Sequence, residues 1–129
     1  MNKIVGKHHL SEEVWQMEIV APHIADERKA GQFIILQVDE NFGERIPLTI
    51  AKADRAAGTI TIVFQTVGAT THKLAKLEVG DSVAAVLGPL GRPTHVEKVG
   101  RVAAVGGGIG VAPLFPIVEA HKAAGNHVT

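Results

Sequence analysis

The stretch Arg101–Leu114 reads RVAAVGGGIGVAPL and decides how the end of the chain folds. Its apolar run Val102–Val105 is typical of a buried strand in a parallel sheet. Pro113 opens an amphipathic helix that we expect to close at Gly125. Between strand and helix lie four glycines, Gly106, Gly107, Gly108 and Gly110. A strand, a glycine turn and a helix start in this order predict an α/β unit.

The glycine turn allows two interpretations. Glycine lets the backbone approach a phosphate closely, and the N–H groups at a helix N-terminus point at an anion. A dinucleotide fingerprint needs glycine at its first, third and sixth positions, but counting from Gly106 the sixth position is Val111. A phosphate site and a tight structural turn therefore both stay open. A second strand has barely begun when the chain reaches Thr129, so we expect the front part of a longer protein.

Length and composition narrow the class of protein. A chain of 129 residues suits one domain and a remnant of another, and 46% hydrophobic residues suffice for a packed core. Lys and Arg together number 13, as do Asp and Glu, so no basic excess attracts nucleic acid or anionic lipid. Without cysteine, the chain alone cannot build a disulfide or an iron–sulfur cluster, which is compatible with a reducing compartment.

Two segments bear on targeting and membranes. Met1–Leu10 lacks the apolar core of a signal peptide. Val102–Val118 is uncharged, but its glycines and prolines argue against a membrane helix. We expect a cytoplasmic protein with no membrane or nucleic-acid partner.

From the start to about Leu87 the hydrophobic pattern has a period of two, which indicates half-buried strands separated by turn signals. One helix, Thr71–Leu77, interrupts them. We expect strands at Asn2–His9, Glu13–Val20, Gln32–Val38, around Pro47, Thr59–Gln65 and Ser82–Leu87. This predicts an all-β antiparallel six-stranded Greek-key barrel, followed by the first strand and helix of an α/β domain.

The boundary between these two parts follows a turn-rich segment. Gly88–Pro93 reads GPLGRP, and the pattern changes across it from alternating to α/β. We place the boundary near Glu97–Gly100. The predicted division is a barrel of residues 1–98 and an α/β fragment of residues 99–129.

The segment Arg45–Ile50, RIPLTI, places a cation, a proline and a hydroxyl group within one strand. Because Pro47 cannot donate to a β-ladder, this strand is an edge, is bulged or faces a ligand. Arg45 offers a guanidinium fork for phosphate, and Thr49 can hydrogen-bond the edge of a heterocycle. An exposed arginine and an ordinary strand threonine are the alternative.

A second segment, Val67–Thr71, precedes the predicted helix of the barrel. Gly68 permits close approach, the hydroxyls of Thr70 and Thr71 can donate, and the helix N-terminus favours an anion. Plain N-capping by one threonine is the alternative. The seven histidines show no metal-ligand spacing, and no nucleophile–base arrangement appears. We therefore expect no metal site and no catalytic side chain.

Four segments, taken in order, resemble the ferredoxin–NADP reductase superfamily, and within it the small FAD-carrying subunits of bacterial electron-transfer complexes. They are Gly43–Ile50, Val67–Thr71, Gly88–Gly91 and Gly106–Pro113. The likeness runs over the whole chain. It implies an N-terminal FAD-binding barrel followed by an NAD(P)-binding α/β domain.

The resemblance also implies a cofactor site. Thr49 matches the hydroxyl residue of the family pattern Arg-x-Tyr-Ser, which puts Leu48 at the aromatic position and Ile46 at the arginine position, with Arg45 one residue early. Residues implied to bind FAD are Arg45, Pro47, Leu48, Thr49, Val63, Phe64, Gln65 and, as the pyrophosphate loop, Gly68, Thr70 and Thr71. Those implied to bind the nicotinamide nucleotide are Gly107, Gly108 and Gly110.

The implied function is electron transfer between NAD(P)H and a ferredoxin-type iron–sulfur partner through FAD, beside a larger iron–sulfur/flavin oxidoreductase subunit. In related subunits a C-terminal cysteine cluster binds [2Fe–2S], and such cysteines would lie past Thr129. We expect no catalysis by this chain alone, and a homodimer. The alternative is a cofactor-free barrel that docks a larger subunit, which the absence of tyrosine and the shifted Arg45 favour.

Overall fold

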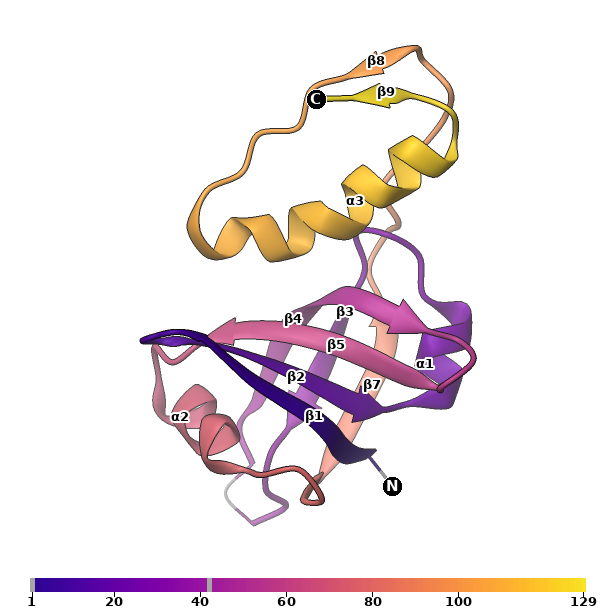
Figure 1. The fold of residues 1–129 in the computed structure, drawn as a ribbon. Coiled ribbons are helices and arrows are strands. Elements are labelled where there is room, and N and C mark those ends of the chain that lie inside the picture. Colours follow the sequence, from indigo (N-terminus) through magenta and orange to yellow (C-terminus); the bar gives the residue numbers. More distant parts are fainter. Residues whose placement is uncertain (1, 42) are drawn as a thin grey trace.

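The computed structural model describes residues 2–41 and 43–129 and contains an antiparallel sheet nearly closed into a barrel (Figure 1). Seven strands form the sheet in the order β6-β1-β2-β5-β4-β3-β7. Their bounds are β1 Asn2–Ser11, β2 Val14–Val20, β3 Phe33–Gln37, β4 Arg45–Asp54, β5 Thr59–Gln65, β6 Ser82–Val83 and β7 Ala85–Leu90. The antiparallel barrel predicted from the period of two is confirmed.

The segment predicted as one strand, Ser82–Leu87, is divided between the two edges of the sheet. β6 pairs with β1 at one edge, whereas β7 pairs with β3 at the other. Between them the Ala84 N–H donates to the Val38 carbonyl at 3.3 Å. One extended segment thus joins both edges, which is why seven strands occur where six were predicted.

The core of the barrel is built from alternate residues of its strands. Met17 and Ile19 of β2, Ile62 and Phe64 of β5, and Leu74 of the following helix belong to one buried cluster. Burying a large aliphatic or aromatic side chain contributes about 1.5–3 kcal/mol. Because successive side chains of a strand point to opposite faces, the residues between these core positions face outward and are available for a binding site.

Two helices accompany the barrel, where the sequence predicted one. The predicted helix is present as α2, Ala69–Lys76, two residues earlier than expected. The prediction of a single helix is wrong because α1, Pro22–Glu27, is too short to show a helical period. Pro22 starts it, and Ile24 and Ala25 bury themselves against the core. No helix in the described part of the chain is long and apolar enough to cross a membrane.

The C-terminal part contains β8 Arg101–Val102, the 3₁₀ turn η1 Gly108–Gly110, α3 Val111–Ala123 and β9 His127–Val128. β8 and β9 pair in parallel, as expected of an α/β unit. Figure 1 shows α3 lying between the barrel and this pair. The prediction of a buried strand over Val102–Val105 is wrong. Val105 is 92% exposed, because within residues 2–41 and 43–129 only β9 pairs with β8.

Asn126 fixes the connection between the barrel and this C-terminal part. Its side chain is buried, and Oδ1 accepts the N–H groups of Val99 and Gly100 at 2.7 and 2.9 Å. Its Nδ2 donates to the Glu97 carbonyl at 2.8 Å. The connecting segment therefore has a defined path although it forms neither helix nor strand.

Candidate functional site

Strands β4 and β5 separate halfway along their length. β4 pairs with β3 over Arg45–Thr49 but with β5 only from Ile50 to Asp54. β5 stays paired with β2 along its whole length. Beyond the rung that joins Ile50 to Ile62, a fork opens between the first half of β4 and the last residues of β5.

The backbone of β4 faces this fork at Pro47 and Thr49. The Ile50 N–H donates to the Gln32 carbonyl on the β3 side at 3.2 Å, and neighbouring residues of a strand point to opposite sides. Thr49 and Pro47 therefore direct their backbone groups away from β3. Because Pro47 lies where β4 has no partner on the fork side, its missing N–H costs no ladder bond.

The backbone of β5 faces the fork from the other side at Val63 and Gln65. The Thr66 N–H donates to the Glu13 carbonyl beside β2 at 2.8 Å, so alternation turns Gln65 and Val63 toward β4. Main-chain polar groups of both strands thus border the opening.

A cavity of about 500 Å³ occupies the fork. It is bounded by β4, by β5, by the loop before α2, and by η1 with the start of α3. The lining residues are Ile46, Pro47, Leu48, Thr49, Val63, Phe64, Gln65, Val67, Thr71, Ile109, Gly110, Ala112 and Pro113. The glycine turn and helix start that were singled out in the sequence therefore close the cavity opposite the strands.

Most of the sequence-predicted site residues meet in this cavity. They are Pro47, Leu48, Thr49, Val63, Phe64, Gln65, Thr71 and Gly110. Phe64 is 2% exposed and belongs to the core, so its ring is turned away from the cavity, and Leu48 packs partly against the same core. Outside the lining lie Arg45, Gly68, Thr70, Gly107 and Gly108. Arg45 is exposed two positions before Pro47, on the same face of β4.

The loop before α2 is fixed by a hydroxyl group. Thr71 Oγ1 accepts the N–H groups of Val67 and Gly68 at 3.0 Å each and donates to the Gly68 carbonyl at 3.0 Å. The hydroxyl that the sequence predicted as a ligand donor is thus engaged by its own loop. The N–H groups of Ala69, Thr70 and Thr71 are the first of the helix and have no acceptor within it.

At three positions near the cavity, neither the backbone conformation nor the packing of neighbouring atoms requires a glycine. Gly68 and Gly107 are extended, with φ of −148° and −149°, and Gly110 is helical with φ of −61°. A Cβ atom added at any of the three meets no atom within 4 Å. Their missing side chains leave open space at the starts of α2 and α3.

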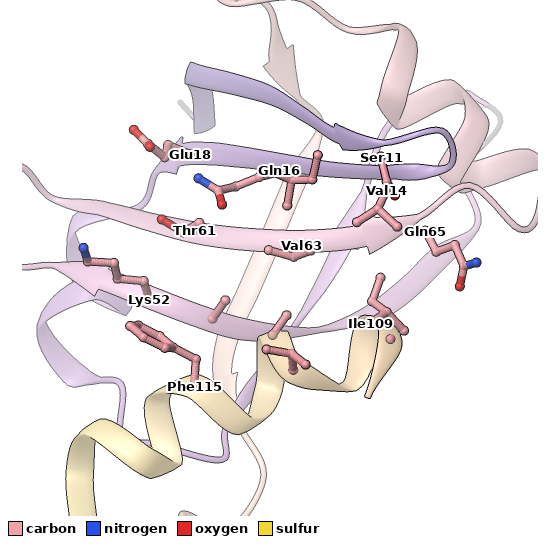
Figure 2. Close-up of a pocket in the computed structure, with 15 residues that line it drawn as sticks. Ser11, Val14, Gln16, Glu18, Lys52, Thr61, Val63, Gln65, Ile109 and Phe115 are labelled. Atoms are coloured by element: carbon pink, nitrogen blue, oxygen red, sulfur yellow. The ribbon is translucent and has the colours of Figure 1, made fainter. Parts of the chain in front are cut away.

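A larger cavity of about 700 Å³ continues the fork between α3 and the outer face of β2, β5 and β4 (Figure 2). The two cavities share Val63, Gln65, Ile109 and Ala112. Figure 2 shows Gln16, Thr61 and Lys52 along its strand side and Phe115 of α3 across from them. Of its lining residues, Val63, Gln65 and Gly108 were predicted from the sequence. The others, such as Gln16 and Lys52, were missed because outward polar side chains look like ordinary surface positions.

An acidic residue missed in the sequence lies beside the site. Thr70 Oγ1 donates to Glu44 Oε2 at 3.0 Å, which links the residue before Arg45 to the start of α2. The sequence feature that could have indicated this residue is its position directly before Arg45. No group of three or more His, Cys, Asp or Glu in the described residues is placed to hold a metal ion.

Comparison with known proteins shows which superfamily the chain resembles. No protein-family model matches the chain. The chain is 43% identical, over all of its length, to a dihydroorotate dehydrogenase B (NAD+) electron transfer subunit homologue of Thermotoga maritima, of which it covers 45%. The structure of an NADH-dependent reduced ferredoxin–NADP oxidoreductase overlays 99% of this chain with a TM-score of 0.96 at 42% identity, covering 46% of that chain. The chain is similar over its whole length to proteins of the ferredoxin–NADP reductase superfamily.

A more distant relative agrees. The dihydroorotate dehydrogenase B (NAD+) electron transfer subunit of Fusobacterium nucleatum is 30% identical over 85% of this chain, which covers 44% of it. The chain thus spans just under half the length of these curated relatives. The superfamily resemblance and its barrel fold are confirmed. The cofactor residues stay predictions, to which the cavity adds Ile46, Val67, Ile109, Ala112 and Pro113, close in sequence to the predicted positions.

Proposed function

We propose that the chain is the FAD-carrying part of an electron-transfer subunit that moves electrons between NAD(P)H and an iron–sulfur partner. Relatives named as a dihydroorotate dehydrogenase B electron transfer subunit homologue and an NADH-dependent reduced ferredoxin–NADP oxidoreductase support it. The observation that carries the proposal is the cavity in the fork. It brings together the hydroxyl of Thr49, strand backbone that has no β-ladder partner, and the start of α3 at Gly110.

The fork suits an isoalloxazine ring, which has apolar faces and a polar edge. Leu48, Val63 and Ile109 supply apolar wall, although the family's aromatic ring partner is replaced by Leu48. The backbone groups of Thr49 and Gln65, with the Thr49 hydroxyl, suit the polar edge. The volume of about 500 Å³ falls within the usual range for small-molecule and cofactor sites.

The loop before α2 suits the pyrophosphate. Free N–H groups at Ala69 and Thr70 point out of the helix start, and the space left by Gly68 is the kind of cradle that a Cβ atom would fill. Thr71 holds the loop in shape through its hydroxyl. The exposed guanidinium of Arg45 lies beyond the lining, where a charged phosphate reaches solvent.

The glycine turn before α3 suits the nicotinamide nucleotide. Gly110 lines the fork, and Gly107 and Gly108 precede it with open space around them. Bound FAD supplies the exchange between hydride and single electrons, while this chain orients the ring and excludes water from one side. No side-chain acid or base is assigned, because hydride transfer depends on the relative placement of two rings.

The remaining expectations extend this proposal. Residues 1–98 form the FAD unit and residues 99–129 begin the nucleotide unit. The partners are a larger iron–sulfur/flavin oxidoreductase subunit and a ferredoxin-type carrier, with a [2Fe–2S] centre held outside this chain. The cytoplasmic location and the homodimer remain predictions.

Reconstitution tests the proposal directly. The 129-residue chain is incubated with FAD, freed of excess by gel filtration and examined for a flavin absorption band. We expect a coloured protein in which FAD is bound in a one-to-one ratio. A colourless preparation that takes up no FAD would instead support the cofactor-free docking barrel.

A further inference from the structure

Glu44 and Thr70 form a hydrogen bond beside the cavity in the fork, outside its lining. Thr70 Oγ1 donates to Glu44 Oε2 at 3.0 Å, although the two residues are 26 positions apart in the sequence. Glu44 directly precedes β4, which forms one wall of the cavity, and Thr70 is the second residue of α2. The bond therefore joins the two elements to which the proposed function assigns the ring and the pyrophosphate.

The chemistry of this contact resembles that of a bound phosphate. A carboxylate is an anion that accepts hydrogen bonds, and it lies at a helix start that favours negative charge. It accepts the hydroxyl hydrogen of Thr70, which a pyrophosphate oxygen would also need. A carboxylate and a pyrophosphate cannot both accept this one hydrogen, and their negative charges repel each other at short range.

We propose that Glu44 is an internal anionic occupant of the pyrophosphate loop, displaced when a phosphate-bearing flavin binds and setting the affinity of the chain for it. This inference rests on the proposed FAD site. Glu44 is exposed, so its side chain can swing into solvent without leaving a buried charge behind. The residue thus determines how strongly the site favours the phosphate-bearing part of the ligand, and leaves recognition of the ring unchanged.

The opposite role for Glu44 would be purely structural. If the carboxylate served only to hold Thr70 in place for the pyrophosphate, removing it would loosen the loop and weaken binding. The two roles predict opposite signs for the same substitution, so they are separable by affinity alone.

The experiment measures the dissociation constants of FAD and riboflavin for the 129-residue chain and its variants by fluorescence titration. Glu44→Gln keeps an acceptor but removes the charge, and Glu44→Ala removes both. Glu27→Gln, at the exposed end of α1, is the control with the same change in net charge. We expect both Glu44 variants to bind FAD about five- to tenfold more tightly, with riboflavin affinity unchanged and Glu27→Gln like the parent.

Other outcomes are equally decisive. If the parent chain binds FAD and the Glu44 variants bind it equally or more weakly, the inference fails while the proposed function stands. If riboflavin affinity rises as much as FAD affinity, Glu44 acts on the ring and not on the pyrophosphate, and the inference also fails. If neither the parent nor any variant binds FAD, the proposed function fails and the inference falls with it.

Discussion

Thr49 offers both its backbone and its hydroxyl group to the proposed ring site. Its side chain lies on the outward face of β4, and its backbone turns toward the fork because Ile50 is bonded to the β3 side. A hydrogen bond from the hydroxyl to FAD contributes about 0.5–1.5 kcal/mol. We expect Thr49→Val to weaken FAD binding about three- to tenfold and Thr49→Ser to restore most of it, as measured by fluorescence titration. Equal affinities for all three would remove Thr49 from the site.

A substitution at Gly68 can test whether the ligand, rather than the fold, requires glycine there. Gly68 is the N-cap of α2, its φ is −148°, and a Cβ atom there meets nothing. Serine is a slightly better N-cap than glycine, by a few tenths of a kcal/mol. We expect Gly68→Ser to keep or raise the free energy of unfolding in urea while weakening FAD binding. Unchanged affinity would mean that no phosphate approaches this position.

At the residue scale the sequence predicted which positions lie together around the cavity better than it predicted how their side chains are directed. Pro47, Thr49 and Gly110, which were chosen from the family pattern, line one cavity. The pattern did not reveal that the Thr71 hydroxyl is engaged within its own loop, or that the Phe64 ring belongs to the core. Those roles depend on the direction of a side chain, which follows from strand parity and tertiary contacts.

At the scale of elements, the fork arises because one long strand changes partner. β4 pairs first with β3 and then with β5, with a register shift between Ile50 and Lys52. The sequence predicted a strand around Pro47 that is an edge, is bulged or faces a ligand. A hydrophobic period does not determine the register of a strand or the point at which it changes partner. The same limit explains why the segment of β6 and β7 was predicted as one strand.

Asn126 is expected to hold the connecting segment around Glu97–Gly100 against the β8–α3–β9 unit. Losing a buried side chain that makes three main-chain hydrogen bonds costs about 1–3 kcal/mol locally. We expect Asn126→Ala to speed amide hydrogen exchange at Val99 and Gly100 while leaving Ile62 in the barrel unchanged. Asn126→Asp, which keeps both accepted bonds, is the matched control. Exchange rates unchanged in the alanine variant would show that the connection is held by other contacts.

Arg28 lies at the C-terminal end of α1, with Glu119 of α3 among the charges that act on it. Burial lowers the pKa of Arg28, and Glu119 partly opposes this. A cation with a lowered pKa costs stability at every pH below that value, and the cost disappears only as the pH rises through it, in the alkaline range.

It follows that Arg28→Met keeps or raises the urea midpoint at pH 7, because the buried charge is removed. Glu119→Gln lowers the midpoint slightly, since its exposed carboxylate is screened by solvent. The measurement is equilibrium unfolding of the two variants beside the parent. A clear fall for Arg28→Met would mean that contacts of the guanidinium outweigh its desolvation.

At the scale of the whole molecule, the site lies where the barrel meets the glycine turn and α3. Figure 1 shows α3 across the β4–β5 side of the barrel, and residues of η1 and α3 line both cavities. A barrel followed by a helical segment was predictable from the change in hydrophobic period. Their mutual placement was not, because it depends on long-range contacts such as those between α3 and β4.

The central claim is that the opening between β4 and β5 holds a flavin nucleotide, and a ¹⁵N-resolved NMR titration of the chain with FAD tests it most directly. We expect saturable shifts at the amides of Thr49, Gln65, Gly68 and Thr70, with Lys3 and Val83 on the far pair of strands unaffected. Saturable shifts confined to Gln16 and Thr61 in the larger cavity, or none at all, would contradict it.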